Sequence, residues 1–395
     1  MNDIRQSVKP KYLLISHHPK DRSISPCTTV YNVFLSPKAV YPYADYIFVH
    51  SSPKQFKQEL REKTENQNVT LLFNGCCSLL SDNAIYALKY AKKNNLSVII
   101  YWHEMAWQLN QHFASFTDQQ WEKINQMLQE SYVKHWVPFS QAKQLIMYIF
   151  KRNYEDVLIV TEAIDLDDYI PKNQSNLSNN IKLLGSGSVA NIETCFRKGT
   201  DYFCKICQEL SQNSSDLNFD GYWFGASEEE VSKFSLDIPD NCHFLGFVDN
   251  LPTQFPDYDI FLLTSRDDPS PIVAFEALAC NLPVFCFDSV GTREMLPPEF
   301  VASDIDMMIN NIINYCYHQE KYSPNFFRKI AEDYAPQKFL ERIDRKHNLI
   351  TIDQNKYFKK YSEQKEIKIK QDALKNEHSF IRKIARRMKN YLRKS

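Results

Sequence analysis

The segment from residue 259 to residue 287 constrains the fold more than any other part of this sequence. A buried-strand pattern at 259–264 leads through a short loop into a helix, and a second apolar strand follows at 283–287. Asp268 lies just past the first strand, and Glu276 lies eight positions later, inside the helix. Free N–H groups at a helix N-terminus favour anions, and carboxylates accept hydrogen bonds from hydroxyl groups. This segment is typical of a parallel sheet that binds an anionic, hydroxyl-rich ligand.

Short apolar runs alternate with helical patterns along most of the chain. Strand patterns lie at residues 12–16, 46–49, 69–73, 98–102, 135–138, 157–160, 181–185, 221–224 and 243–248. Helical patterns lie at residues 82–94, 117–131, 141–151, 302–318 and 325–348, with a further helix starting near 198. Strands that alternate with helices favour parallel sheets covered on both faces, so we expect an α/β protein.

The length of 395 residues suggests two domains of ordinary size. The polar stretch 171–180 lacks periodicity and is predicted to be a linker between domains at 1–170 and 181–350. We expect two doubly wound, Rossmann-like domains that face each other across a cleft, followed by a basic helical tail at 351–395. Ligands of such sheets bind beyond the carboxyl ends of the strands.

The composition excludes several classes of protein. The sequence has no run of about 18 apolar residues, so no transmembrane helix is expected. The ten cysteines are scattered along the chain, and no signal peptide is evident, which favours reduced thiols in a cytoplasmic protein. We expect no metal site, because no Asp-x-Asp triad is expected in a loop of the kind that holds a divalent cation in the other large glycosyltransferase fold. We also expect no cofactor.

Several motifs occur together in a characteristic order. Lys198-Gly199 precedes a strand ending in Phe244-Leu245-Gly246-Phe247, the two acids Asp268 and Glu276 follow, and Gly291 lies in a loop that ends at Glu294. In this order the chain resembles the retaining GT-B glycosyltransferases of family 4, most clearly over residues 181–300. The resemblance implies transfer of a hexose or deoxyhexose, with retention, from a nucleoside-diphosphate sugar to a hydroxyl of a glycan or lipid-linked glycan, as in polysaccharide biosynthesis.

The resemblance assigns roles to residues of the second domain by position. Asp268 matches the acid that contacts the donor hexose, and Glu276 matches the acid that contacts the ribose hydroxyls. Lys198, followed by Gly199, matches the basic residue that binds the donor diphosphate, and Arg197 is expected to assist. The remaining donor-binding positions, which offer backbone atoms at the helix start and in the glycine loop, are Ile272, Val273 and Gly291.

Each of these assignments has a plainer structural alternative. Asp268 would also suit the N-cap of the following helix, with Asp267 as the alternative sugar-binding acid. Lys198 would otherwise be a solvated surface lysine, and Gly291 a turn glycine. A carboxylate on the largely apolar helix of Glu276 needs partners, which favours a ligand.

The first domain offers weaker candidates. His103 ends a hydrophobic strand and resembles a family histidine that contacts the donor sugar or the acceptor, so we group it with Lys198 and Asp268 as catalytic. Candidate acceptor-side residues, each with a packing or capping role as the alternative, are His17, His18, Glu104, Trp107 and Ser140. Ser140 is most simply the cap of the helix at 141–151.

The chain departs from the family pattern in two loops. The first acid is Asp268 where the family usually has Glu, and Pro269-Ser270-Pro271 replaces the usual Gly-Phe-Gly. Two prolines remove two N–H donors and stiffen this loop. Ser16-His17-His18-Pro19 stands where the family has a glycine loop. The alternative hypothesis is a catalytically silent module that binds nucleotide sugars or serves as a scaffold.

The net charge of −1 conceals a basic C-terminus: residues 354–395 hold 14 Lys or Arg and 4 Asp or Glu. Within it, residues 379–395 place one apolar stripe among seven basic residues and no acid. Such a helix can lie on an anionic membrane. The alternatives are that the helix docks on the acidic body of the protein or that the tail is disordered. The protein is therefore expected in the cytoplasm, either free or at the inner face of the membrane, with no nucleic acid partner.

Removal of residues 379–395 is predicted to weaken binding to anionic vesicles, because each basic residue near the surface contributes about 1 kcal/mol. Co-sedimentation of the full chain and the truncated chain with phosphatidylserine vesicles tests this. Equal binding by both chains would contradict the prediction.

Overall fold

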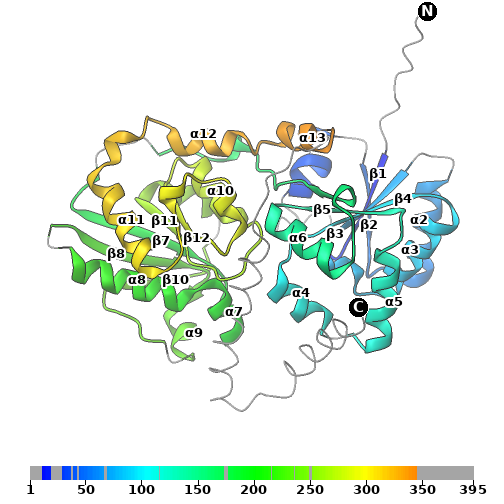
Figure 1. Cartoon of the computed structure of the whole chain (residues 1–395), viewed down its shortest axis with the longest axis horizontal. Coiled ribbons are helices and arrows are strands. Elements are labelled where there is room, and N and C mark those ends of the chain that lie inside the picture. The colour runs from blue at the N-terminus through cyan, green and yellow to red at the C-terminus, as the bar shows by residue number, and fades with distance from the viewer. Residues whose placement is uncertain are drawn as a thin grey trace, which may run out of the picture.

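The computed structural model describes residues 11–18, 29–36, 39–41, 44–65, 69–114, 116–172, 177–214, 216–234, 236–248 and 251–344. The predicted basic helix at 379–395 lies outside these residues. Figure 1 shows two lobes side by side, each built around a sheet. Within the described residues, no helix has the length and apolar character needed to cross a membrane.

The first domain is a parallel sheet with helices on both faces. Its strand order is β2-β1-β3-β4-β5-β6, and every pairing is parallel. Leu13 and Ile15 of β1 belong to one buried core, whereas Tyr12 and Leu14 belong to another on the opposite face. The strands are β1 (Lys11–Ser16), β2 (Ala44–Phe48), β3 (Val69–Asn74), β4 (Ser97–Tyr101), β5 (Val133–Val137) and β6 (Val157–Ile159).

The helices of the first domain follow its strands in alternation. They are η1 (Tyr31–Leu35), α2 (Pro53–Thr64), η2 (Cys76–Leu79), α3 (Asp82–Lys93), α4 (Ala106–Phe113), α5 (Asp118–Leu128), α6 (Ser140–Ile149), η3 (Tyr154–Asp156) and η4 (Leu166–Asp168). The strand-and-helix alternation predicted from the sequence is confirmed here, with helices that end earlier than their apolar patterns.

The second domain repeats this architecture. Its strand order is β13-β12-β11-β7-β8-β10-β9, parallel except for the pairing of β9 with β10. Its elements are β7 (Asn180–Ser186), α7 (Ile192–Lys198), α8 (Thr200–Asn213), β8 (Asn218–Phe224), β9 (Ala226–Ser227), α9 (Glu228–Ser232), β10 (Cys242–Gly246), η5 (Leu251–Thr253), η6 (Phe255–Asp257), β11 (Ile260–Leu263), α10 (Ile272–Ala279), β12 (Val284–Phe287), η7 (Gly291–Glu294), η8 (Pro298–Phe300), β13 (Val301–Ala302), α11 (Ile305–Tyr317), η9 (Gln319–Lys321), α12 (Phe326–Glu332) and α13 (Pro336–Asp344).

Each sheet has one point where the strand order reverses, between β1 and β3 in the first domain and between β7 and β11 in the second. Loops that leave neighbouring strands in opposite directions open a crevice at such a point, where α/β proteins bind ligands. The loop after β7 leads to Lys198, and the loop after β11 carries Asp268. The topology therefore brings the predicted donor-binding residues together.

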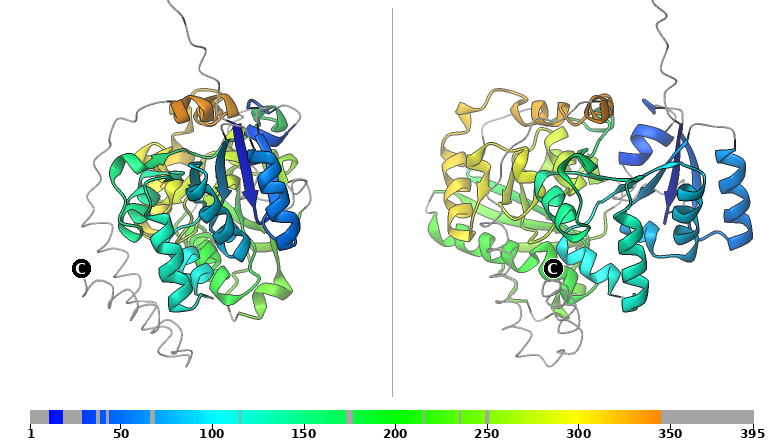
Figure 2. Two further views of the ribbon diagram at one scale, coloured as in Figure 1. Left: turned by 90° about the vertical axis from the view of Figure 1, so that its right-hand side faces the viewer. Right: turned by 45° about the vertical axis from the view of Figure 1, so that its right-hand side comes forward.

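The last helix crosses back onto the first domain. In Figures 1 and 2, α12 and α13 run from one lobe to the other along one edge of the molecule. Phe339 of α13 is fully buried against Phe34, Tyr101 and Trp136, with ring centroids 6.0–6.1 Å apart. The chain thus links its two domains twice, through the segment after β6 and through α13.

Two sequence-based predictions of local structure were wrong. The helix predicted at 325–348 is two helices, α12 and α13, because Pro336 cannot continue a helix that began before it. Ser140 is the first residue of α6, and the N-cap is Phe139 without a side-chain hydrogen bond. The helix predicted to start near residue 198 is confirmed as α8, which begins at Thr200, although the preceding α7 was not predicted.

Phe339→Ala is predicted to destabilise the first domain by about 3–5 kcal/mol, because it removes a fully buried ring from an aromatic core. Urea unfolding of the full chain measures the loss. The exposed neighbour Gln337→Ala serves as the control and should change stability by less than about 0.5 kcal/mol. Equal losses from the two variants would show that α13 does not dock through Phe339.

Candidate active site

A buried ion pair lies at the point where the strand order of the second sheet reverses. The Lys198 ammonium is 2.7 Å from Asp268 Oδ2, and both side chains are largely buried. Arg197 Nη1 lies 3.8 Å from the same oxygen. Asp268 is not the N-cap of α10, since that position is Pro271. Two cations therefore surround one buried carboxylate at the predicted donor site.

Glycine at position 199 makes this approach of Lys198 to Asp268 sterically feasible. Gly199 has a φ of 70° and ends α7 in the left-handed conformation. A Cβ atom there would lie 1.9 Å from the carbonyl oxygen of Thr264, at the end of β11. Only glycine allows α7 to end directly against β11, which sets Lys198 beside the loop of Asp268.

The neighbouring acid faces the other domain. The Asp267 carboxylate accepts a hydrogen bond of 2.8 Å from the backbone N–H of Trp107 in α4. Burial raises the pKa of Asp267 to about 6, although that hydrogen bond acts in the opposite direction. Asp267 thus serves an interdomain contact, whereas Asp268 faces Lys198.

Glu276 lies inside α10 and meets the segment that joins the two domains. The Tyr169 hydroxyl donates to Glu276 Oε1 over 3.1 Å. Burial raises the pKa of Glu276 to about 7, and the hydrogen bond from Tyr169 opposes this rise. A carboxyl group with one hydroxyl donor retains acceptor capacity for further hydroxyls.

The start of α10 packs closely against the glycine loop. Ile272 is buried and Val273 half-buried in its first turn, whose N–H groups have no partners within the helix. The Gly291 N–H donates to the Asp268 carbonyl over 3.1 Å. A Cβ atom at Gly291 would lie 1.8 Å from the Pro269 carbonyl oxygen, so glycine is needed for this packing. The loop of Asp268 is therefore held by Lys198 on one side and by Gly291 on the other.

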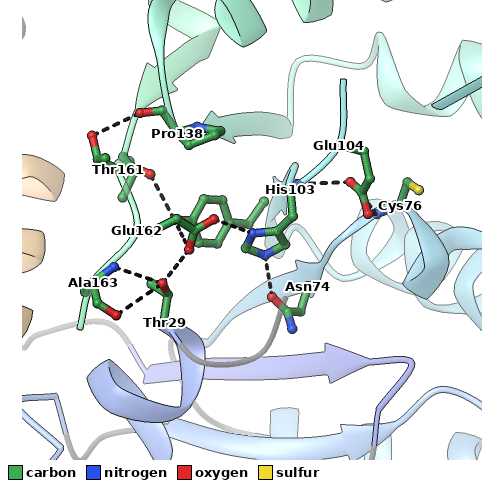
Figure 3. A network of polar contacts seen from close by, with 11 residues as sticks. Thr29, Asn74, Cys76, His103, Glu104, Pro138, Thr161, Glu162 and Ala163 are labelled. Atoms are coloured by element: carbon green, nitrogen blue, oxygen red, sulfur yellow. Dashed lines mark hydrogen bonds and ion pairs between the residues drawn. The ribbon is translucent and has the colours of Figure 1, made fainter. Parts of the chain in front are cut away.

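In the first domain, a buried polar network surrounds His103 at the end of β4 (Figure 3). His103 Nδ1 lies 2.8 Å from Glu162 Oε1, and Nε2 lies 2.8 Å from Asn74 Oδ1. The Glu162 carboxylate also accepts from the hydroxyls of Thr29 and Tyr101. Burial opposes a charge on the His103 ring, but the Glu162 carboxylate outweighs it and raises the pKa of His103. With an acceptor at both nitrogens, the ring is suited to the imidazolium form.

Ser140 and Trp107, two of the predicted acceptor-side residues, form contacts between the domains. The Glu294 carboxylate accepts from the Ser140 N–H over 3.1 Å and from its hydroxyl over 2.5 Å. The Trp107 indole N–H donates to Glu193 Oε1 over 2.8 Å. Glu294 of the second domain therefore caps the N-terminus of α6. The sequence had suggested that Ser140 itself was this cap.

The other predicted acceptor-side residues lie at the carboxyl edge of the first sheet. The buried Glu104 carboxylate accepts from the N–H groups of Cys76 and His103, which ties two loops together. His17 Nδ1 lies 2.6 Å from His50 Nε2. The His18 carbonyl accepts a hydrogen bond from the Tyr46 hydroxyl. These contacts anchor the loop after β1.

Sequence reasoning missed a group of potential metal ligands. Cys76, Cys77 and His112 place one ligand atom each within 4.8 Å of one another. Adjacent cysteines and a histidine 35 positions away match no ligand spacing that a sequence reveals. Glu162 and Asn74 also escaped notice, because their partner His103 is distant in the sequence.

Comparison with known proteins identifies the second domain. Residues 184–316, which include Lys198, Asp268, Glu276 and Gly291, match the family model of glycosyl transferases group 1. The second domain therefore resembles glycosyl transferases group 1 over these residues, and it is called the group 1 domain below. An uncharacterized glycosyltransferase of Haemophilus influenzae is 26% identical to this chain over 187 residues, 44% of this chain and 50% of that protein. The chain thus spans about half the length of this curated relative.

Solved structures show that the group 1 domain and the first domain together form the GT-B fold. HepE of Anabaena, in complex with UDP, has a TM-score of 0.60 at 12% identity, over 85% of this chain and 98% of HepE. The lipopolysaccharide outer core galactosyltransferase WaaB has a TM-score of 0.59 at 15% identity, over 85% and 98%. Sucrose-phosphate synthase of Thermosynechococcus elongatus has a TM-score of 0.58 at 13% identity, over 85% and 97%. The GT-B architecture predicted from the sequence is confirmed.

Glu276→Gln is predicted to stabilise the group 1 domain at pH 8 more than at pH 5. The pKa of Glu276 rises from its ordinary value of 4.5 to about 7 on folding. Between these values the unfolded chain loses the proton while the folded chain keeps it, so stability falls as pH rises. Gln is neutral throughout and avoids this loss, which amounts to about 2–3 kcal/mol.

Urea unfolding of both proteins at pH 5 and pH 8 measures the effect. The exposed Glu229→Gln is the control and should show no such dependence on pH. An equal effect of Glu276→Gln at the two pH values would refute the raised pKa.

Proposed function

We propose that the protein is a retaining glycosyltransferase of family 4 type. It transfers a hexose or deoxyhexose from a nucleoside-diphosphate sugar to a hydroxyl group of a glycan or lipid-linked glycan. The observation that carries this proposal is the buried Lys198–Asp268 pair, with Arg197 beside it, at the strand-order reversal of the group 1 domain.

The donor diphosphate is proposed to bind at Lys198 and Arg197. Both cations lie at the end of α7, and Asp268 is their carboxylate partner. A diphosphate would contact the same ammonium, while the N–H groups of Ile272 and Val273 at the start of α10 favour anions. Asp268 would then accept hydrogen bonds from the hexose hydroxyls, and Glu276 from the ribose hydroxyls. Lys198, Arg197 and these N–H groups would stabilise negative charge on the leaving diphosphate without a metal ion.

The reacting carbon is proposed to lie between this cluster and His103. In the reaction, the bond between the sugar C1 and the diphosphate oxygen breaks, and the acceptor hydroxyl oxygen forms a bond to C1. The acceptor proton passes to the leaving phosphate oxygen, so charge balances without a protein base. Glu162 and Asn74 fix the His103 ring at both nitrogens, which orients it toward the sugar.

Uridine diphosphate sugars are the first donors to test. HepE has been solved with UDP, with UDP and glucose, and with UDP-glucose. The similarity of this chain to HepE is one of fold, at 10–12% identity, so the sugar remains part of the proposal. The acceptor is proposed to bind against the first domain, near Trp107 and His17. The silent binding module is the competing proposal, and catalysis distinguishes the two.

Lys198→Ala and Glu276→Gln are predicted to lower the release of nucleoside diphosphate from the donor by at least about 100-fold. Each removes a group that stabilises the leaving diphosphate or holds the donor. The assay incubates the protein with UDP-, GDP- and dTDP-sugars, with and without glycan acceptors, and measures the nucleoside diphosphate formed.

Lys233→Ala and Glu229→Gln, on the exposed surface of α9, are matched controls that should retain activity. Tight nucleotide binding without release from any donor, with every acceptor, would contradict the enzyme and favour the silent module. Release that persists in both active-site variants would contradict the assigned roles.

A further inference from the structure

Two cysteines and one histidine converge at the carboxyl edge of the first sheet. Cys76 and Cys77 follow β3 in the short helix η2, and His112 lies near the end of α4. Cys77 Sγ is 3.5 Å from His112 Nδ1 and 3.8 Å from Nε2. One ligand atom from each of the three residues lies within 4.8 Å of the others.

We propose that Cys76, Cys77 and His112 form a binding site for Zn²⁺. Thiolate sulfur and imidazole nitrogen are the ligands that zinc prefers in proteins, and hard cations such as Mg²⁺ avoid them. With Zn–S of about 2.3 Å and Zn–N of about 2.0 Å, neighbouring ligands of a tetrahedral site lie about 3.5 Å apart. The Cys77–His112 separation of 3.5 Å already meets this value. The third ligand, Cys76 Sγ, lies within 4.8 Å of the other two ligand atoms and would need to move closer by about 1 Å.

The location of the cluster also favours a ligand. The loops after β1 and β3 leave the sheet where its strand order reverses, and they carry His17 and the two cysteines respectively. Such a crevice is the usual ligand site of an α/β sheet. Three protein ligands leave the fourth position of zinc to a water molecule, as in open zinc sites.

A metal ion at this site would join two parts of the candidate active site. It would tie α4, whose Trp107 N–H donates to Asp267 of the second domain, to the loop that follows Asn74, the last residue of β3 and a partner of His103. Zinc is therefore assigned a positioning role beside the cleft, and the sugar-transfer chemistry does not pass through it. Zinc binding requires neither donor nor acceptor, so it stands or falls independently of the proposed function.

The test uses the full-length protein after removal of metal by a chelator under reducing conditions. Zn²⁺ is titrated in competition with a chromophoric chelator, and Co²⁺ is titrated while thiolate-to-cobalt charge-transfer absorption is recorded. We expect one equivalent of each metal to bind and the charge-transfer band to appear. Zn²⁺ should also raise the melting temperature, because it binds the folded chain.

Cys77→Ser and His112→Gln should each weaken Zn²⁺ binding by at least about tenfold, since they remove direct ligands. The matched controls, Cys316→Ser and His318→Gln, lie on or next to α11, outside the cluster, and should bind as the wild type does. Circular dichroism establishes that each variant is folded. If Cys77→Ser does not fold, His112→Gln and the cobalt spectrum of the wild type decide the matter.

The proposal is overturned by absence of stoichiometric Zn²⁺ binding to the wild type, or by a cobalt complex without the thiolate band. It is also overturned if His112→Gln binds Zn²⁺ as tightly as His318→Gln does. In each of these cases the donor assay above is unaffected, so failure of the zinc site is distinguishable from failure of the proposed glycosyltransferase.

Discussion

Two carboxylates of the second domain bind backbone N–H groups of the first, and the geometry of the site depends on them. Asp267 accepts from the Trp107 N–H in the first turn of α4, and Glu294 accepts from the Ser140 N–H at the start of α6. Both contacts place negative charge at a helix N-terminus, where the helix dipole favours it. They connect loops at the carboxyl edges of the two sheets, the edges at which His103 of one domain and Asp268 of the other lie.

The adjacent acids Asp267 and Asp268 show how one loop serves two domains. The Asp267 carboxylate faces α4 and the Asp268 carboxylate faces Lys198. Pro269 and Pro271 stiffen the segment that follows, and Gly291 lets the Pro269 carbonyl pack closely. The Pro-Ser-Pro loop therefore has a physical role: it fixes the direction of both carboxylates.

The sequence alone indicated the two parallel sheets, because the alternation of strands and helices follows from local periodicity, and motifs within about 100 residues suggested candidate residues for a donor site. It could not indicate the partners of those residues. Glu162 lies 59 positions from His103, and Glu294 lies 154 positions from Ser140. Such pairs are created by tertiary packing. The sequence therefore suggested that Ser140 caps α6, whereas the Glu294 carboxylate caps that helix by accepting from the Ser140 N–H. The group of Cys76, Cys77 and His112 was missed for the same reason.

Two buried acids with raised pKa values have different consequences for the folded protein. Asp267 and Glu276 both lie where burial disfavours their charge. The hydrogen bond from the Trp107 N–H of the first domain offsets the cost of burying the ionised Asp267 carboxylate. Ionised Asp267 therefore favours this contact between the domains. Glu276 accepts a hydrogen bond from the Tyr169 hydroxyl, and its remaining acceptor capacity suits a ligand. Hydroxyl groups of a bound donor would stabilise its ionised form and lower its pKa. Donor binding and loss of the Glu276 proton are then linked. Because a hydroxyl-rich ligand offsets the free-energy cost of burying the ionised acid, that cost favours such a ligand over one without hydroxyl groups.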